Sequence, residues 1–238
     1  MVGRWLQRRK LWWVLWPLLV VGAVFGARYI ALAVVQLVHF VNPLFTGNTI
    51  VGEQWFRVAA LIAAVGMAMG VSLIVAGQKL SRKLMGIHRL PNWQDIGLGV
   101  AGFVIYAAVA TILLAVLKSL SLVDIDQLQT IGSTGVYGMD RMMVFVALTI
   151  VVPFVEELLF RGYLYGRLRG AHAPLWLSAS ITSLTFGVLH GQWNVGIDVF
   201  CLSMVACYLR EQTGTVWPGV IMHMIKNMIA FYIAFSVT

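Results

Sequence analysis

The chain is dominated by seven long apolar segments that are separated by short polar stretches. These segments are Leu11–Val41, Val58–Gly77, Ile96–Leu117, Met142–Phe160, Leu175–His190, Val195–Leu209 and Val216–Val237. Most of them reach the roughly 20 residues that a helix needs to cross a bilayer, where it satisfies its own backbone hydrogen bonds. Charged residues make up only 11% of the chain, against about 25% in soluble domains. We therefore expect an all-α fold, a polytopic membrane helical bundle of about seven to eight transmembrane helices.

The net charge of +8 arises from short basic clusters that flank the apolar segments. Because no basic patch is interleaved with aromatic residues, we expect the lipid bilayer and no nucleic acid as a partner. Basic loops stay on the cytoplasmic side of a membrane. Most basic residues fall on one side of the expected spans: Arg4, Arg8, Arg9, Lys10, Lys79, Arg82, Lys83, Arg89, Arg161, Arg167, Arg169 and Arg210. The sequence thus predicts an integral membrane protein with a cytoplasmic N-terminus.

The first apolar segment has two interpretations. A basic start followed by an apolar run is typical of a cleaved signal peptide. The apolar run resumes after Arg28 and continues to Val41, which favours an uncleaved first span that tilts or ends in an interfacial turn. Residues 1–140 carry no signature beyond their apolar spans, whereas 141–238 contain the polar motifs described next, and we expect both parts to form one integrated bundle.

Two adjacent carboxylates and an arginine lie at the end of the fourth apolar segment, in the run EELLFRG at residues 156–162. An ionised group in hydrocarbon costs about 2.5–3.5 kcal/mol on insertion scales, so such groups are usually functional. Glu157 and Arg161 have the i,i+4 spacing, with the acid first, that favours an ion pair. On a helix, Glu156 points about 100° away from Glu157, and no cation lies one turn from it in the sequence. We therefore interpret Glu156 as the general base of a hydrolytic site.

A histidine, His190, shares a helix face with Phe186 in the fifth segment. A single histidine in an apolar run is more often structural than catalytic. Here, the fourth and fifth segments are expected to form an antiparallel hairpin that turns near residues 172–174. Glu156 and His190 stand at nearly equal distances from this turn, so a rise of about 1.5 Å per residue places them at similar depth.

The last apolar segment presents His223 and Asn227 from one helical stripe, because they are spaced i,i+4. Counted from the start of its helix, His223 is expected to be shallower than His190. We favour a structural role, as polar links between helices, for four residues: Arg28, His39, Asp198 and Lys226. Lys226 is able to pair with Asp198.

These motifs together resemble those of a known family. Glu156-Glu157-x-x-x-Arg161, Phe186-x-x-x-His190 and His223-x-x-x-Asn227 are similar, in order and spacing, to the three signature motifs of the CPBP family. These are the CAAX-prenyl-protease and bacteriocin-processing intramembrane proteases, also called the Abi family. The resemblance covers about Arg141–Phe235 and implies an intramembrane endopeptidase that hydrolyses a peptide bond of a membrane-associated protein or peptide. The short loops of this small chain favour a bacterial member of the family, in the plasma membrane.

The resemblance also implies roles for individual residues. Glu156 and His190 would activate a water molecule, His223 and Asn227 would bind the oxyanion or orient the water, and Glu157 with Arg161 would assist or hold the site together. Phe186 would support the site. Glu156, His190 and His223 also form a plausible zinc set with an open fourth position. The cofactor stays open, and the absence of an HExxH pair favours a mechanism without metal.

Two other classes of function compete with proteolysis. A membrane immunity factor or scaffold could keep the CPBP fold without activity, since a fold does not establish a function. A transporter could use intramembrane charges as a relay, but the polar groups concentrate in the C-terminal half and form no path across the membrane. The sequence does not tell whether the substrate is a prenylated protein or a bacteriocin leader.

Overall fold

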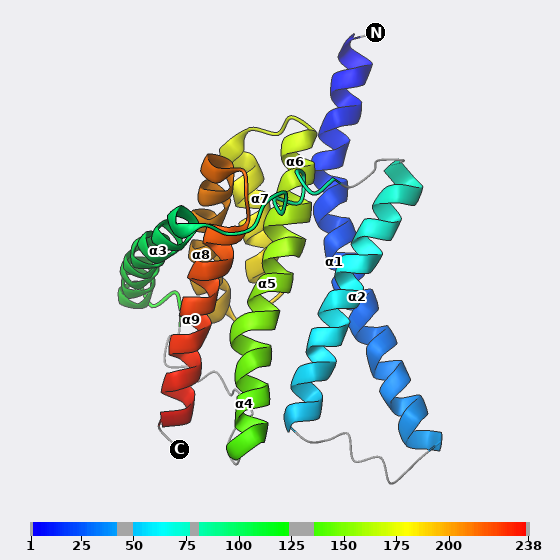
Figure 1. The fold of residues 1–238 in the computed structure, drawn as a ribbon. Helices are drawn as coiled ribbons and strands as arrows, with labels where there is room; N and C mark the ends of the chain where they lie inside the picture. The colour runs from blue at the N-terminus through cyan, green and yellow to red at the C-terminus, as the bar shows by residue number, and fades with distance from the viewer. Residues whose placement is uncertain (1, 42–49, 77–80, 124–135, 237–238) are drawn as a thin grey trace.

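A computed structural model describes residues 2–41, 50–76, 81–123 and 136–236, all of whose regular elements are helices. Lys79, one of the basic residues assigned to the cytoplasmic side, lies outside them. The α-helices are α1 (Val2–Val41), α2 (Ile50–Ala76), α3 (Trp93–Ser119), α4 (Gly138–Val146), α5 (Val152–Glu157), α6 (Tyr165–Gly170), α7 (Leu175–Val188), α8 (Trp193–Thr213) and α9 (Trp217–Ser236). Helices α4, α5 and α6 run on as one long helix through two π-helical segments, η1 (Ala147–Val151) and η2 (Leu158–Leu164). The predicted all-α bundle is confirmed (Figure 1).

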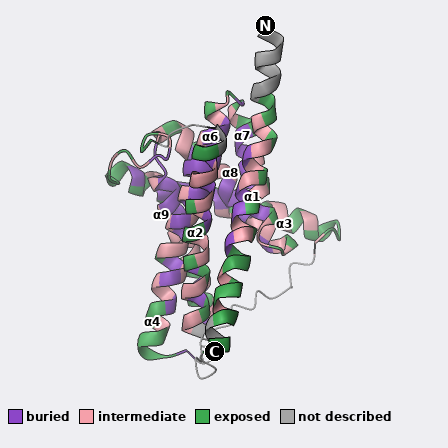
Figure 2. Ribbon diagram, turned by 90° about the vertical axis from the view of Figure 1, so that its right-hand side faces the viewer, coloured by how far each residue is buried: buried purple, intermediate pink, exposed green. Residues whose placement is uncertain are grey.

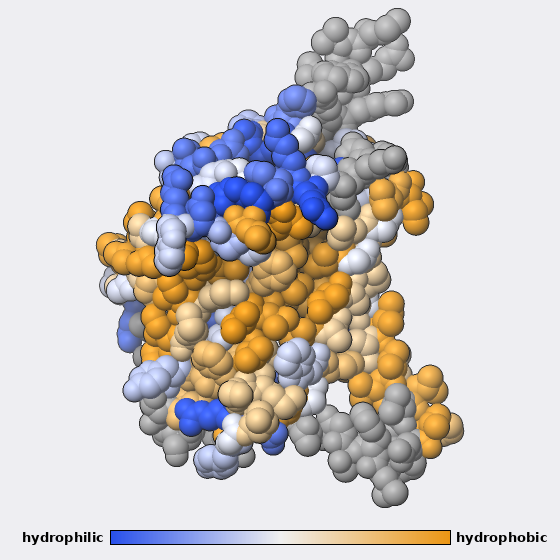
Figure 3. Space-filling model, in the orientation of Figure 1, coloured by the Kyte–Doolittle hydropathy of each residue, from blue (hydrophilic) through white to orange (hydrophobic). Residues whose placement is uncertain are grey.

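Five helical stretches among the described residues are long and apolar enough to cross a membrane, and α7 is a shorter apolar helix. Many large apolar side chains on them are exposed. Figure 3 shows these side chains as a broad apolar belt below a hydrophilic cap at the end of the bundle nearer the N-terminus. An exposed apolar belt has a natural partner in lipid, so the protein is an integral membrane protein. Its first predicted span lies in one helix, α1, without an intervening turn.

The connection between α2 and α3 is fastened to the end of the bundle that carries the cap. Arg210 of α8 donates to the carbonyl of Leu84 at 3.0 Å, and the amide of Val216 donates to the carbonyl of Gly86, also at 3.0 Å. The indole of Trp217 donates to the carbonyl of Arg89 at 2.7 Å. These bonds fix the start of α9, the helix that carries His223 and Asn227.

The long helix α4–α6 and α7 form the expected hairpin. Helix α6 ends at Gly170 and α7 begins at Leu175, so the prediction of a turn near residues 172–174 is confirmed. Helices α7 and α8 then approach closely at Gly187 and Gly196, where a Cβ on Gly187 would lie 2.7 Å from the Gly196 carbonyl oxygen. Figure 2 shows buried residues gathered around α6, α7 and α8, whereas most of α3 is exposed. His190, which follows the end of α7, thereby lies inside the bundle.

Candidate active site

A cavity of about 420 Å³ opens between α2, the long helix α4–α6, the end of α7, and α9. Four polar residues from three of the expected motifs line it: Glu156, His190, His223 and Asn227. Apolar side chains such as Leu61, Val152 and Phe231 make up much of the remaining wall. The depth difference expected between His190 and His223 therefore does not separate them, because both imidazoles reach the same cavity.

The neighbouring carboxylates of α5 have different surroundings. Glu157 is fully buried and pairs with Arg161, whose Nη1 lies 2.9 Å from its Oε1. The imidazole of His223 adds a second contact, with Nδ1 at 3.1 Å from the same oxygen. The side chain of Glu156 is 17% exposed, and its Oε2 lies 3.7 Å from Nε2 of His223. The predicted ion pair is present, and His223 lies between the two acids.

A carboxylate accepts hydrogen bonds. The contact between Nδ1 of His223 and Glu157 therefore requires Nδ1 to carry the hydrogen and to donate it to that acid. Nε2 is then the nitrogen on the side of Glu156. A carboxylate that fixes the orientation of a working imidazole is a recurrent arrangement in enzymes. Glu157 is buried behind the cavity and does not line it, and its carboxylate contacts the ring of His223 from that side.

Phe186 forms the floor on which the charged groups pack. Its ring lies under the guanidinium of Arg161, 4.8 Å from the ring centroid, and meets the imidazoles of His190 and His223 edge-on at 4.8 and 6.0 Å. A cation over an aromatic face gains about 2 kcal/mol or more when desolvated. Phe186 thus touches three of the polar side chains of the site.

The tautomer of His190 follows from its hydrogen bond. Nδ1 lies 2.8 Å from the carbonyl oxygen of Phe186 in the preceding turn. Since a carbonyl only accepts, Nδ1 is the donor, and in a neutral imidazole Nε2 then carries the free lone pair. His190 therefore offers the cavity a nitrogen that can accept a proton.

Asn227 is placed by an irregularity in the long helix. In η1 the amide of Val152 bonds to the carbonyl of Ala147, five residues earlier. The next residue, Pro153, has no N–H, so the carbonyl of Leu148 lacks its donor within the helix. Nδ2 of Asn227 supplies the missing bond at 2.8 Å. A carboxamide has two N–H groups, so the second remains for the cavity.

Gly219, in the first turn of α9, also shapes the site. A Cβ at this position would lie 2.7 Å from Oε2 of Glu157 and 3.3 Å from Cβ of Ala206. The absent side chain thus lets the backbone of α9 pass directly over the buried acid. Sequence reasoning missed this residue, and its position in a Trp-Pro-Gly run at a helix start gave no sign of a packing role.

Zinc was considered for Glu156, His190 and His223. Among the described residues, no three histidines, cysteines or acids gather as a set of metal ligands. The residues therefore do not fit a three-ligand zinc centre in this arrangement, and no catalytic step is derived through a metal.

The structural pair expected outside the site is present. Nζ of Lys226 lies 3.6 Å from Asp198, which also accepts a hydrogen bond of 2.6 Å from the hydroxyl of Tyr106 on α3. The pairing of Lys226 with Asp198 is thus confirmed, and it ties α3, α8 and α9 together beside the cavity.

Comparison with known proteins agrees with the motifs. Residues 138–229 match the family described as Type II CAAX prenyl endopeptidase, Rce1-like, which confirms the resemblance to the CPBP family over this part of the chain. An uncharacterized 24.3 kDa protein of Escherichia coli is 29% identical over 89 residues, which is 36% of this chain and 41% of that protein. The chain thus matches about two fifths of the length of this relative. No solved structure gives a significant match.

Proposed function

We propose that this protein hydrolyses a peptide bond of a membrane-associated protein or peptide in the cavity between α2, α5, α7 and α9. The observation that carries the proposal is the convergence of Glu156, His190, His223 and Asn227 on this one cavity. An acid, two imidazoles and a carboxamide are what water activation and oxyanion binding require. The apolar walls suit a substrate that arrives through the bilayer.

Glu156 and His190 activate the water in this proposal. The carboxylate of Glu156 removes a proton from the water, while Nε2 of His190 accepts the water's other hydrogen bond and holds it in place. The water oxygen attacks the peptide carbonyl carbon, and the proton held by Glu156 passes to the leaving amine as the C–N bond breaks. General-base help of this kind contributes about 10²–10⁴ in rate.

His223 and Asn227 stabilise the negative charge that develops on the carbonyl oxygen. Nε2 of His223 faces the oxyanion as one donor while Glu157 holds its other nitrogen. The N–H of Asn227 that is not used by Leu148 is the second donor. Removing one preorganised donor from an oxyanion site costs about 10²–10³ in turnover. Glu157 and Arg161 contribute by position, since they lie behind the cavity.

The test compares the membrane peptidome of cells that carry the wild-type protein with that of cells carrying Glu156→Ala. We expect at least one peptide or protein to remain unprocessed in the variant, because the water is no longer activated. Arg82→Gln, a change at an exposed residue outside the cavity, should process it normally. Membrane levels of all three proteins are compared to exclude misfolding.

Two outcomes would contradict the proposal. Full processing by Glu156→Gln would remove the general base from the mechanism. An unchanged peptidome together with an unchanged cellular phenotype in both Glu156→Ala and His190→Ala would favour a non-enzymatic immunity or scaffold protein with the same fold.

A further inference from the structure

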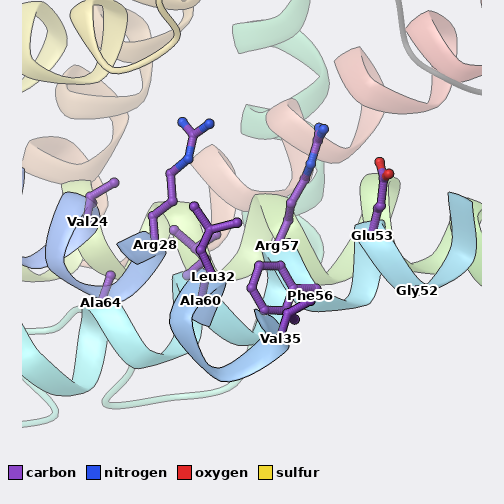
Figure 4. Close-up of a pocket in the computed structure, with 11 residues that line it drawn as sticks. Val24, Arg28, Leu32, Val35, Gly52, Glu53, Phe56, Arg57, Ala60 and Ala64 are labelled. Carbon is purple, nitrogen blue, oxygen red and sulfur yellow. The ribbon is translucent and has the colours of Figure 1, made fainter. Parts of the chain in front are cut away.

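A second hollow adjoins the catalytic cavity on the side of α1 and α2. It has a volume of about 690 Å³, and we call it the α1–α2 groove. Its walls are mostly apolar, with three charged side chains among them: Arg28, Glu53 and Arg57 (Figure 4). Arg57 and Leu61 line both the groove and the catalytic cavity. The two hollows therefore meet at these side chains, which places the groove directly beside the candidate site.

The two arginines lie where cations are costly. Arg28 falls within the candidate span Lys10–Leu37, and Arg57 within Val51–Ile74. No ion pair or hydrogen bond holds either guanidinium among the residues that the structure describes. Such charges within spans mark pathways or ligand sites unless another group of the protein pairs with them. A purely structural role for Arg28, expected from the sequence, has no contact in the described residues to support it.

Figure 4 shows the side chains of Arg28, Arg57 and Glu53 projecting to the same side of the α1–α2 pair. Two cations and one acid give the groove a net charge of +1. One bound monoanion would neutralise it. The planar guanidinium matches a carboxylate through paired N–H donors, which makes arginine the residue best suited to recognise this group.

We propose that Arg28 and Arg57 bind a carboxylate of the peptide substrate, so that the α1–α2 groove is an acid-selective subsite. This inference rests on the proposed proteolysis and extends it to substrate selection. The carboxylate belongs to an acidic side chain or to the C-terminus of the peptide. Continuity with the catalytic cavity favours a peptide over the phosphate of a lipid.

Direct binding tests the subsite without requiring turnover. The full chain carrying Glu156→Gln is placed in phosphatidylcholine nanodiscs and titrated with three N-palmitoylated Ala/Leu pentapeptides. One has a free C-terminus, one is amidated with a single internal Glu, and one is amidated and neutral. We expect one or both acidic peptides to bind about tenfold or more tighter than the neutral one, as a charge-assisted hydrogen bond does.

The matched variants add Arg28→Gln and Arg57→Gln, alone and together, and Arg82→Gln as the control arginine. The double variant should lose the preference for acid while it binds the neutral peptide as before. Arg57→Lys should retain part of the preference. A comparison of the two acidic peptides tells whether a side chain or the terminus is recognised.

Equal binding of all three peptides, or a preference that survives the double variant, would overturn the proposal. An arginine-dependent loss of peptide binding when phosphatidylglycerol is added would assign the groove to lipid instead. Proteolysis is scored separately with the same peptides and the chain that retains Glu156. Cleavage without a preference for acidic peptides would contradict only the proposed subsite. A preference for acidic peptides without cleavage would contradict only the proposed proteolysis.

Discussion

At the scale of single residues, the candidate site contains two neighbouring glutamates with different surroundings, one buried in an ion pair and one lining the cavity. The i,i+4 spacing predicted the pairing of Glu157 with Arg161, and the helical angle predicted that Glu156 would point elsewhere. What spacing could not predict was His223 between the two acids. That contact depends on how α9 packs against α5, and nothing local in either sequence encodes it.

Gly219 provides a test of this packing. In Gly219→Ala the new methyl group would meet Oε2 of Glu157 at 2.7 Å, and that oxygen cannot yield freely because Arg161 and His223 hold the carboxylate. We expect a loss of peptide processing of about tenfold or more, since a small misplacement of catalytic groups can cost 10²-fold. Processing of the peptide identified with Glu156→Ala is the measurement.

Gly97→Ala is the matched control, because a Cβ at Gly97, in the interior of α3, meets nothing within 4 Å. It should process normally. If Gly219→Ala processes the peptide as well as this control, the close approach of α9 to Glu157 is not required for processing.

At the scale of elements, the long helix α4–α6 departs from its sequence pattern. The segment Met142–Phe160 reads as one uniform apolar helix, yet the structure contains the π-helical segments η1 and η2 on either side of α5. Such bulges occur frequently at functional sites. Pro153 was the available signal for η1, but a proline alone also fits a simple kink. The partner of the free carbonyl, Asn227, lies 79 residues from Leu148 and could not be found locally.

This link between η1 and α9 predicts a non-additive pair of substitutions. Asn227→Ala leaves the Leu148 carbonyl without a donor and should destabilise the protein by about 1–3 kcal/mol. Pro153→Ala restores a backbone N–H near that carbonyl. In the Pro153→Ala background, Asn227→Ala should therefore cost clearly less. A double-mutant cycle from denaturant unfolding in detergent measures the coupling.

Equal costs of Asn227→Ala in the two backgrounds would show that the proline and the amide are not coupled. Peptide processing should be lost in Asn227→Ala in both backgrounds, because the proposed donor to the oxyanion is absent either way. The cycle thus separates the structural bond of Asn227 from its proposed catalytic one.

At the scale of the whole molecule, the apolar segments predicted the fold well. Each coincides with a described helix, and the hairpin of α4–α6 with α7 was predicted from the turn residues. The α1–α2 groove and the cavity could not be predicted, because they depend on how widely helices separate. Figure 1 places the N-terminus and the end of α9 at opposite ends of the bundle. With a cytoplasmic N-terminus, the end of α9 is external.

Reporter fusions test this orientation. Alkaline phosphatase fused after α9 should be active in a bacterial host, because that end is expected outside. The same reporter fused after Thr213, before α9, should be inactive. Since α7 and α8 form a hairpin, the expectation is the same whether they cross fully or return within the bilayer. Phosphatase activity only in the Thr213 fusion would invert the predicted topology.

The ion pair within the long helix bears on how the protein is made. The charges of Glu157 and Arg161 neutralise each other within one helix. This segment can therefore leave the translocon before the helices that later pack against it have been synthesised. His223 and Asn227 lie more than sixty positions later and emerge from the ribosome several seconds afterwards, at about 5–20 residues per second. A nascent chain would therefore insert Glu157 already paired, and the candidate site would stay incomplete until α9 joins it.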